Sequence, residues 1–478
     1  MKISSSAIKE SSIVLLPFIF IESGMRYHHL RMQLHTPSRR ILIHALVVIG
    51  LAIVIFAIYS HVLSFGFLTW DNYADILRNE RVSQHSISAF RNIFFDVLVL
   101  YYTPLTLLSW NIEHLIFGFQ PAVFHLDNIL LHLLNAVLVY VICVRHSKRL
   151  WVGILAALLF SIHPLNVEVV AWLSTRKHLL GTAFALLTLI TYQSKTTTSY
   201  LLSIAFFVAA LASSVTSIGI VLVLLLINKN LFRVFPFALV ALMFGAIGFG
   251  TEGVYDRVVS IPIILFIYCK GILLMLWHFI WPFNLSPIYS QSLPVIWWSP
   301  VSILVVVVGA LLLALFVRFR KKLKIAYLPL SFFVLMVIPL VFAIQKEDGL
   351  FITQDRYAYL PTIGLLYLIA VGVETLWHKF NHVRILIASV TTIIIVFFSV
   401  VAYQRTFVWE NDEVFYRALV AHQPSYIFGY LGLGKALEDS GFESEATDVY
   451  RQALLIDPIA VSKNLRRTES DILPLLIE

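Results

Sequence analysis

Long apolar runs alternate with short polar segments over most of this chain, and the pattern predicts a bundle of membrane-spanning helices. A transmembrane helix needs about 20 apolar residues to cross a hydrocarbon core of about 30 Å. Some runs are shorter, and their helices are expected to extend into flanking Ser and Thr residues. The pattern predicts about eleven spans, within residues 41–59, 124–144, 151–162, 179–192, 200–212, 218–227, 235–249, 301–316, 325–344, 357–377 and 385–401.

Three further apolar runs are predicted not to cross the membrane. Residues 89–100 and 105–117 are too short to span it and are interpreted as helices lying in the interface. The run 261–280 is long enough, but it carries Lys270 and His278, and counting it as a span places the basic segment 318–324 on the wrong side. We interpret it as interfacial or re-entrant; a missed span or a misread basic loop are the alternatives.

Composition excludes an ordinary soluble protein. Of the 478 residues, 59% are hydrophobic and 13% are charged, whereas soluble domains average about 25% charged residues. The net charge of +8 would suggest nucleic-acid binding in a soluble chain, but here Lys and Arg lie mainly in short loops. They therefore indicate topology, and no nucleic-acid partner is expected. Because Cys143 and Cys269 lie in apolar runs, no disulfide framework is expected either.

The charge pattern also predicts orientation and domains. A cytoplasmic N-terminus places the large loop 60–121 and the C-terminal segment on the non-cytoplasmic side, in a bacterial inner membrane or the endoplasmic reticulum. Residues 1–40 form an N-terminal cytoplasmic extension, whose apolar run 13–21 is not interpreted as a cleaved signal. Residues 41–405 form the polytopic membrane domain, 406–460 a repeat segment and 461–478 a divergent tail.

The segment 406–460 carries a tetratricopeptide-repeat pattern. Pro424 and Pro458 lie 34 residues apart (458 minus 424), which is the length of one repeat. Gly434 and Ala446 are predicted to let two antiparallel helices approach closely. The other pattern positions are Tyr430, Leu433, Leu437, Tyr450 and Ala453. Because a lone repeat cannot bury its apolar face, it must dock on the membrane domain, pair with a partner or be the remnant of a longer array.

One acidic residue in the non-cytoplasmic loop is a candidate catalytic group. Asp71 follows Trp70 in the stretch 67–72, just after the first predicted span. Partial desolvation at a membrane interface raises the pKa of a carboxylate and suits it to act as a general base. The simpler interpretation is that Asp71 ends a helix or faces water.

Polar side chains inside one predicted span form a second group of candidates. His125, Asn128 and His132 lie on one face of the span 124–144 and are expected to point into the bundle. Buried polar groups in a membrane are costly and often functional, although hydrogen bonding between helices explains them equally well. No metal site is expected from these three residues alone.

Charged residues near the outer face form a third group. His163-Pro164 is predicted to break a span, with Glu168 and Arg176-Lys177 at the same level, and Arg356 precedes the last inward span. These cations are predicted to bind a phosphate, or alternatively to anchor helices at the interface. The sequence contains no Gly-rich phosphate loop, zinc-type Cys/His spacing or Ser-His-Asp elbow.

Several of these stretches resemble those of the transmembrane and tetratricopeptide-repeat (TMTC) family and its bacterial relatives. The resemblance extends in blocks from about Leu68 to Pro458. Its motifs are Trp70-Asp71, Pro104-Leu105-Thr106, Phe124-His125 with Asn128 and His132, His163-Pro164 with Glu168 and Trp172, Arg176-Lys177-His178-Leu179-Leu180, Asp355-Arg356-Tyr357 with Tyr359-Leu360-Pro361 and Gly364, and the repeat.

This resemblance implies an all-α, polytopic membrane bundle of the GT-C type and a glycosyltransferase activity. In such an enzyme a sugar, mannose in the animal members, passes from a polyprenyl-phosphate donor to a protein hydroxyl outside the cytoplasm, and the repeat binds the protein acceptor or a partner. Asp71 would be the catalytic base. GT-C enzymes often use a divalent metal ion such as Mg²⁺ or Mn²⁺. Residues implied in binding the donor phosphate or substrate are His125, His163, Glu168, Arg176, Lys177, Arg356 and Tyr357.

The chain departs from the family pattern at several polar positions. Asn72 replaces a second acid after Trp, Thr103 an Arg, His178 an Asp, and Ser214-Val215 a Lys-Glu pair. A catalytically inactive membrane scaffold that acts through its repeat is therefore the first alternative. A transporter is the second, but a transporter is expected to show two halves with matching broken helices, and this sequence shows none.

Overall fold

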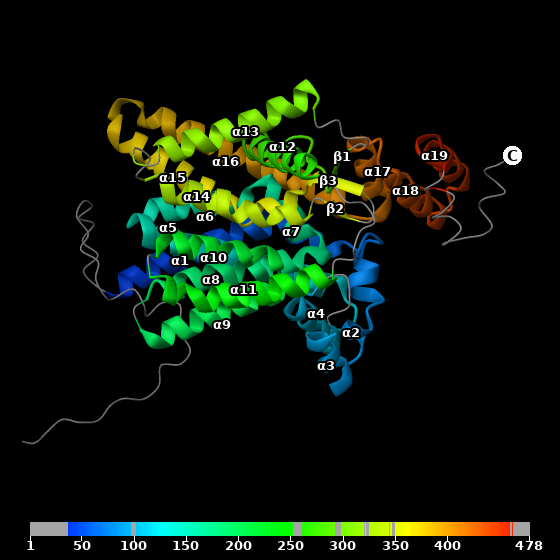
Figure 1. Cartoon of the computed structure of the whole chain (residues 1–478), viewed down its shortest axis with the longest axis horizontal. Coiled ribbons are helices and arrows are strands. Elements are labelled where there is room, and N and C mark those ends of the chain that lie inside the picture. Colours follow the sequence, from blue (N-terminus) through cyan, green and yellow to red (C-terminus); the bar gives the residue numbers. More distant parts are fainter. Residues whose placement is uncertain are drawn as a thin grey trace, which may run out of the picture.

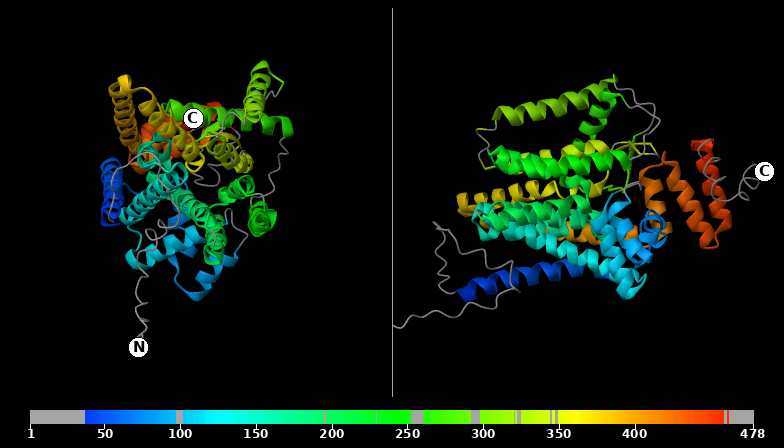
Figure 2. Two further views of the ribbon diagram at one scale, coloured as in Figure 1. Left: turned by 90° about the vertical axis from the view of Figure 1, so that its left-hand side faces the viewer. Right: turned by 60° about the horizontal axis from the view of Figure 1, so that its bottom comes forward.

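The computed structural model of the protein is a helical bundle with a small sheet and a helical segment at one end (Figure 1). The structure describes residues 37–96, 102–194, 196–228, 230–251, 260–291, 298–319, 321, 325–343, 345–346, 349–458 and 461. Most of the long helices run along the long axis of the molecule, and α1 flanks them (Figures 1 and 2).

The bundle is built from apolar helices with few acidic or basic residues inside them. Pro104 and Pro121 occupy the first turns of α4 and α5, where the absent N–H costs nothing, and Gly118 turns the chain between them with a φ of 68°. The bundle helices are α1 (Pro37–Tyr59), α5 (Pro121–Ser147), α6 (Leu150–Ile162), α7 (Val167–Ala171), α8 (Arg176–Tyr192), α9 (Thr197–Ser213), α10 (Ile220–Ile227), α11 (Leu231–Thr251), α12 (Ile261–Ile280), α13 (Pro300–Phe319), α14 (Tyr327–Val337), α15 (Thr362–Lys379) and α16 (Arg384–Thr406).

The predicted spans all contain helices, but the helices differ in length. By length and composition, 5 helices of the described chain are able to cross a membrane, or 6 if the bent pair α6 and α7 counts as one span. The other helices at predicted spans are shorter or less apolar. The bend of 56° between α6 and α7 lies at His163-Pro164, as the sequence predicts. In contrast, α12 is one unbroken helix and is among the 5 that are long and apolar enough to cross. Its interfacial or re-entrant placement stays a prediction.

The non-cytoplasmic elements predicted from charge lie together at one end of the bundle (Figure 1). Within the predicted large loop, the interfacial runs form α3 (Ile87–Phe95) and α4 (Pro104–Phe117), preceded by the short α2 (Glu80–Ser83). The C-terminal helices α17 (Asp412–His422), α18 (Ile427–Asp439) and α19 (Glu443–Ile456) lie at this same end. At the opposite end of α5, Arg149 pairs with Glu374 of α15 at 2.7 Å.

A small antiparallel sheet is the feature that the all-α prediction misses. Its strands are β1 (Tyr289–Gln291), β2 (Gln345–Lys346) and β3 (Gly349–Thr353), in the order β1-β3-β2. From the sequence, residues 345–356 are interpreted as a loop, because strands this short show too little alternation of apolar and polar residues to be recognised. Strand β3 leads directly into the 3-10 turn η8 (Asp355–Ala358).

The C-terminal helices dock on the membrane domain rather than standing alone. A Cβ on Gly434 would lie 2.3 Å from the Tyr450 ring, so this glycine allows α18 and α19 to approach as predicted. Residues of α17, α18 and α19 belong to the same buried apolar cluster as α5 and α8. Docking on the membrane domain is therefore the alternative that the structure supports, whereas the tetratricopeptide assignment stays a prediction.

Two sequence predictions lie outside the described residues. They are the character of the apolar run 13–21 and that of the tail 461–478, of which only Val461 is described. The described chain begins with α1 at Pro37, slightly before the predicted domain boundary at residue 40.

The contact between α12 and the sheet yields a stability prediction. A Cβ on Gly271 would lie 2.4 Å from the backbone oxygen of Ile352 in β3, which cannot move like a side chain. Gly271→Ala is expected to lower the stability by about 1–3 kcal/mol through overpacking, seen as a lower midpoint of thermal unfolding. Gly50→Ala is the control, because no atom lies within 4 Å of that Cβ; equal midpoints for both variants would contradict the close packing.

Candidate functional site

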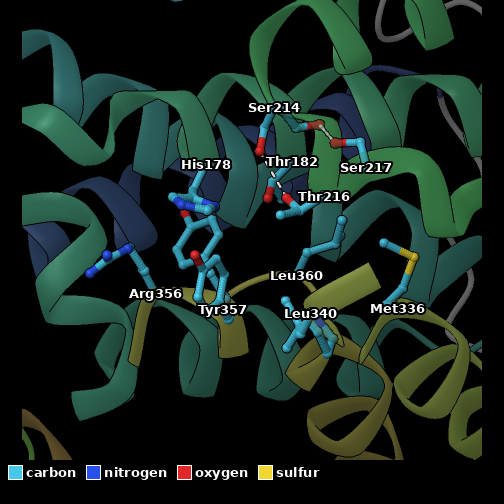
Figure 3. A pocket seen from close by; sticks show the side chains of 13 residues that line it. His178, Thr182, Ser214, Thr216, Ser217, Met336, Leu340, Arg356, Tyr357 and Leu360 are labelled. Atoms are coloured by element: carbon cyan, nitrogen blue, oxygen red, sulfur yellow. Dashed lines mark hydrogen bonds between the residues drawn. The ribbon is translucent and has the colours of Figure 1, made fainter. Parts of the chain in front are cut away.

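A cavity opens between α8, the turn η6 (Val215–Gly219), the turn η7 (Ile338–Ala343) and η8 (Figure 3). The empty space here is about 330 Å³ with open solvent included, and about 20 Å³ of it is free for water-sized groups. In this view Arg356 lies beside Tyr357 and His178, and the side chains of Thr182, Ser214, Thr216 and Ser217 gather on the other side of these two rings. The apolar part of the lining is formed by Met336, Leu340 and Leu360. The cavity therefore has a polar region with a cation and an apolar region.

A second cavity lies next to the apolar region, with about 10 Å³ free for water-sized groups. It shares Leu340 and Tyr357 with the first cavity, and its other lining residues are mostly apolar. They come from α12, α14 and β3 and include Ile272, Met275, Val337 and Phe351. The two cavities are therefore neighbours, and the second adds apolar lining residues next to the polar region of the first.

Arg356 is the charged group at the centre of this region. Its guanidinium is buried and donates to Glu168 Oε1 at 2.6 Å, and it lies 5.0 Å from the centre of the Trp172 ring. Burial lowers the pKa of this group, but Glu168, Tyr357 and Asp71 offset that effect and raise the pKa of Arg356 above its ordinary value. The side chain therefore stays a cation and is within electrostatic reach of Asp71.

Asp71 lies in a tightly held turn between two anchored neighbours. Its φ of 56° is left-handed, a conformation in which Asp is several-fold enriched. Asn72 is buried, and its Oδ1 accepts hydrogen bonds from the N–H and the hydroxyl of Ser174, at 3.2 and 2.6 Å. Asp71 itself is exposed on the protein surface, so no protein group buries it, and its desolvation at the membrane interface stays a prediction.

The two histidines predicted to bind donor or substrate serve the packing of the bundle. His163 caps the bend after α6: one ring nitrogen lies 3.1 Å from Phe279 O and the other accepts from Leu165 N at 3.3 Å. His125 is buried and meets Phe65 edge-on, with ring centroids 6.3 Å apart. Of the predicted binding residues, the cavity lining among the described residues contains Arg356 and Tyr357 but neither histidine. A binding role for the histidines stays a prediction.

The face of α5 that carries His125 does point into the bundle, as predicted. His132 contacts the Tyr359 hydroxyl at 2.7 Å, and Asn128 accepts from the Arg176 Nε at 2.9 Å. Of the two interpretations that the sequence allows, these contacts match hydrogen bonding between helices.

Arg176 belongs to a separate network. Its side chain is fully buried and donates to Glu113 at 2.6 Å, to Phe124 O at 2.8 Å and to Asn128 at 2.9 Å, while Asp127 lies 3.3 Å away. A guanidinium with this many protein partners has little capacity left for a phosphate. The neighbouring Lys177 is half-buried, and its phosphate role stays a prediction.

Sequence reasoning missed a buried group next to Arg356. Asp355 accepts from the Tyr289 hydroxyl at 2.8 Å and lies 3.5 Å from Arg405 of α16. Burial raises the pKa of Asp355, and Arg405 opposes that shift. Asp355 belongs to the same sequence motif as Arg356. The sequence gives no sign that it contacts Tyr289 or Arg405, because these residues lie in distant elements.

The divalent metal implied by the family resemblance finds no matching ligand set. Within the part of the chain that the structure describes, no group of three or more His, Cys, Asp or Glu side chains is arranged to hold a metal ion. The position of the second acid is Asn72, whose oxygen already accepts two hydrogen bonds. We therefore route no chemical step through a metal.

Comparison with curated proteins confirms the resemblance to the TMTC proteins. The chain is 33% identical over 106 residues to protein O-mannosyl-transferase TMTC2 of Mus musculus, covering 22% of this chain and 12% of the relative. It is 23% identical over 391 residues to protein O-mannosyl-transferase F38B6.6 of Caenorhabditis elegans, covering 75% of this chain and 54% of the relative. The chain thus matches about half of the worm protein and a smaller part of the mouse protein. It is a multi-pass membrane protein.

Other comparisons are weaker. No protein-family model matches the chain. Among solved structures, the chain is similar to ArnT from Cupriavidus metallidurans bound to undecaprenyl phosphate, with 12% identity, a TM-score of 0.37 and coverage of 88% of this chain and 77% of that chain. Two positions at which the chain departs from the TMTC pattern, His178 and Ser214, line the first cavity.

The Arg176 network predicts a stability effect that is independent of activity. Arg176→Met leaves Glu113 buried without its cation, which costs about 3–5 kcal/mol for a buried pair. We expect a strongly lowered midpoint of thermal unfolding in detergent. Adding Glu113→Gln removes the unpaired charge and is expected to restore part of the loss; a double variant no more stable than Arg176→Met would show that the pair does not hold these helices.

Proposed function

We propose that the protein is a glycosyltransferase of the GT-C type that transfers a sugar from a polyprenyl-phosphate donor to a protein hydroxyl, as an O-mannosyltransferase does. The observation that carries this proposal is the position of Arg356, which lines a cavity with an apolar extension and is within electrostatic reach of the exposed Asp71. A cation beside an apolar lining and within electrostatic reach of a carboxylate matches what a lipid phosphate donor and a base require. The names of the similar proteins support the same activity.

The donor would bind with its phosphate in the polar region of the first cavity. Arg356 supplies the cation there, and Thr182, Ser214 and Thr216 supply hydroxyl donors. A planar guanidinium suits a phosphate because it presents paired N–H donors. The isoprenoid chain would follow Met336 and Leu340 into the second cavity, where it replaces water against apolar side chains.

Asp71 would act as the general base on the acceptor hydroxyl. The acceptor oxygen attacks the anomeric carbon while the bond from that carbon to the phosphate oxygen breaks, and the proton of the hydroxyl passes to Asp71. The lipid phosphate leaves with the electrons of the broken bond, and Arg356 stabilises its developing charge. Because Asp71 is exposed, a protein acceptor from the aqueous side can reach it.

Topology supports a non-cytoplasmic location for this step. The large loop and the C-terminal helices lie at one end of the bundle, whereas the last turn of α5 and the connection to α6 carry Arg145, His146 and Arg149. With the basic end inside, the N-terminus is cytoplasmic, and the site and the C-terminal segment face outward. The α18 and α19 hairpin would act as a tetratricopeptide segment that receives the protein acceptor or a partner.

Replacement of the base tests this proposal directly. Asp71→Asn removes proton acceptance, so kcat for transfer from a polyprenyl-phosphate sugar is expected to fall by about 10²- to 10⁴-fold, with little change in KM for the donor. The measurement is sugar transfer by the reconstituted full chain, with Glu80→Gln as a control in an exposed acid of the same loop. Equal transfer by wild type and Asp71→Asn removes Asp71 as the base; absent transfer by wild type across several donors favours the scaffold.

A second prediction tests the donor path. Leu340 lines both cavities, whereas Ile338 on the same turn is 41% exposed. Leu340→Trp fills the apolar path and is expected to raise the KM for the lipid donor about 10-fold or more, because the bulk displaces several methylene groups of the donor chain. Ile338→Trp adds the same bulk outside the path and is expected to leave KM unchanged. Similar KM values for the two variants would place the lipid elsewhere.

A further inference from the structure

The turn that carries Asp71 is tied to the first turn of α17. Both the N–H and the hydroxyl of Thr69 donate to Asp412 Oδ1, at 2.7 and 2.9 Å. The Tyr416 hydroxyl lies 3.1 Å from Thr69 Oγ1. Because the Thr69 proton is used on Asp412, Tyr416 is the donor in that contact. Thr69 and Asp412 are 343 residues apart in the chain, so this contact forms only when the C-terminal segment docks.

Trp70 extends the same contact with apolar surface. Its ring meets Phe415 at 5.8 Å and Tyr416 at 6.1 Å on α17, and Tyr426 just before α18 at 6.3 Å. Its backbone oxygen accepts from the Trp172 indole N–H at 3.4 Å. Trp70 is therefore held by the C-terminal segment through its ring and by the membrane domain through its backbone.

Asp71 lies between two anchors that belong to different parts of the protein. Thr69 is fastened to α17, and Asn72 is fastened to Ser174 in the membrane domain. Asp adopts a φ of 56° more readily than most residues do, and the two anchors fix the residues on either side of it. Loss of either anchor frees one side of the turn, which re-aims the Asp71 carboxylate.

We propose that Asp412 is a positioning residue: it holds Thr69 so that Asp71 is aimed at the reacting centre, and docking of the C-terminal helices thereby completes the active site. The catalytic part of this inference rests on the proposed function. The C-terminal segment then has a role in the chemical step, in addition to any role in receiving an acceptor. Displacement of α17 by a bound partner would lower the transfer rate by the same route.

Hydrogen exchange tests the positioning without reference to activity. In the full chain, Asp412→Ala removes the acceptor of the Thr69 N–H, so the amides of residues 67–72 are expected to exchange about 10-fold faster. Asp412→Asn retains an acceptor oxygen and is expected to preserve most of the protection. The matched control is Glu413→Ala, because the neighbouring Glu413 pairs with Arg417 on the exposed side of α17. Unchanged exchange in Asp412→Ala, or equal acceleration in Glu413→Ala, overturns the proposal.

Kinetics then test whether Asp412 acts through Asp71. Asp412→Ala is expected to lower kcat about 10- to 100-fold, as misplacement of a catalytic group does, while KM for the polyprenyl-phosphate sugar and the rate of Glu413→Ala stay unchanged. In the Asp71→Asn background, the same change is expected to have no further effect on the residual rate. Fully additive losses overturn the positioning role. If wild type transfers no sugar, the proposed function fails, and the exchange result alone decides whether α17 positions the turn.

Discussion

The buried ion pair between Arg356 and Glu168 is the interaction on which the arrangement of the site depends. The two residues are 188 positions apart, and their contact joins η8 to α7 at 2.6 Å. Neither charge tolerates burial alone, because an unpaired ion in a low-dielectric interior costs several kcal/mol. The pair therefore fixes the end of β3 against the bent segment after α6, and it keeps the guanidinium charged beside the cavity. The sheet, the packing of α12 through Gly271 and the bend at His163 all serve to bring these two elements together.

Trp172 connects this pair to the rest of the outer end. Its ring lies under the Arg356 guanidinium and stacks on Trp409 with centroids 5.3 Å apart, and its indole N–H reaches the backbone of Trp70. Through these contacts the cavity, the Asp71 turn and the C-terminal helices form one buried assembly. The position of the C-terminal segment is thus linked to the position of the charged site, which gives a physical reason for joining a helical hairpin to this membrane domain.

Two arginines that look alike in the sequence have different surroundings in the structure. Both Arg176 and Arg356 precede apolar runs near the outer face, and both were predicted to bind a phosphate. Arg176 is the first residue of α8, and its guanidinium donates hydrogen bonds to oxygens of α4 and α5. Arg356 lies in the short turn η8 and lines the cavity. The two arginine side chains leave the backbone in different directions. For Arg356 this direction depends on how η8 follows the sheet. The same reason applies to Asp71, whose left-handed turn leaves its side chain exposed at the protein surface.

The sequence alone determined the helical membrane bundle, the break at His163-Pro164, the close helix approach at Gly434 and the short list of polar residues worth testing. These features depend on local composition and spacing, namely apolar run length, proline geometry and the absence of a side chain. Only the tertiary structure decided which polar residues meet: Arg356 with Glu168, Asn72 with Ser174 and Thr69 with Asp412. Such pairs join residues that are 102 to 343 positions apart. One sequence carries no local signal for these partners, because the requirement to pair buried charges and hydrogen bonds is met only once the helices have packed.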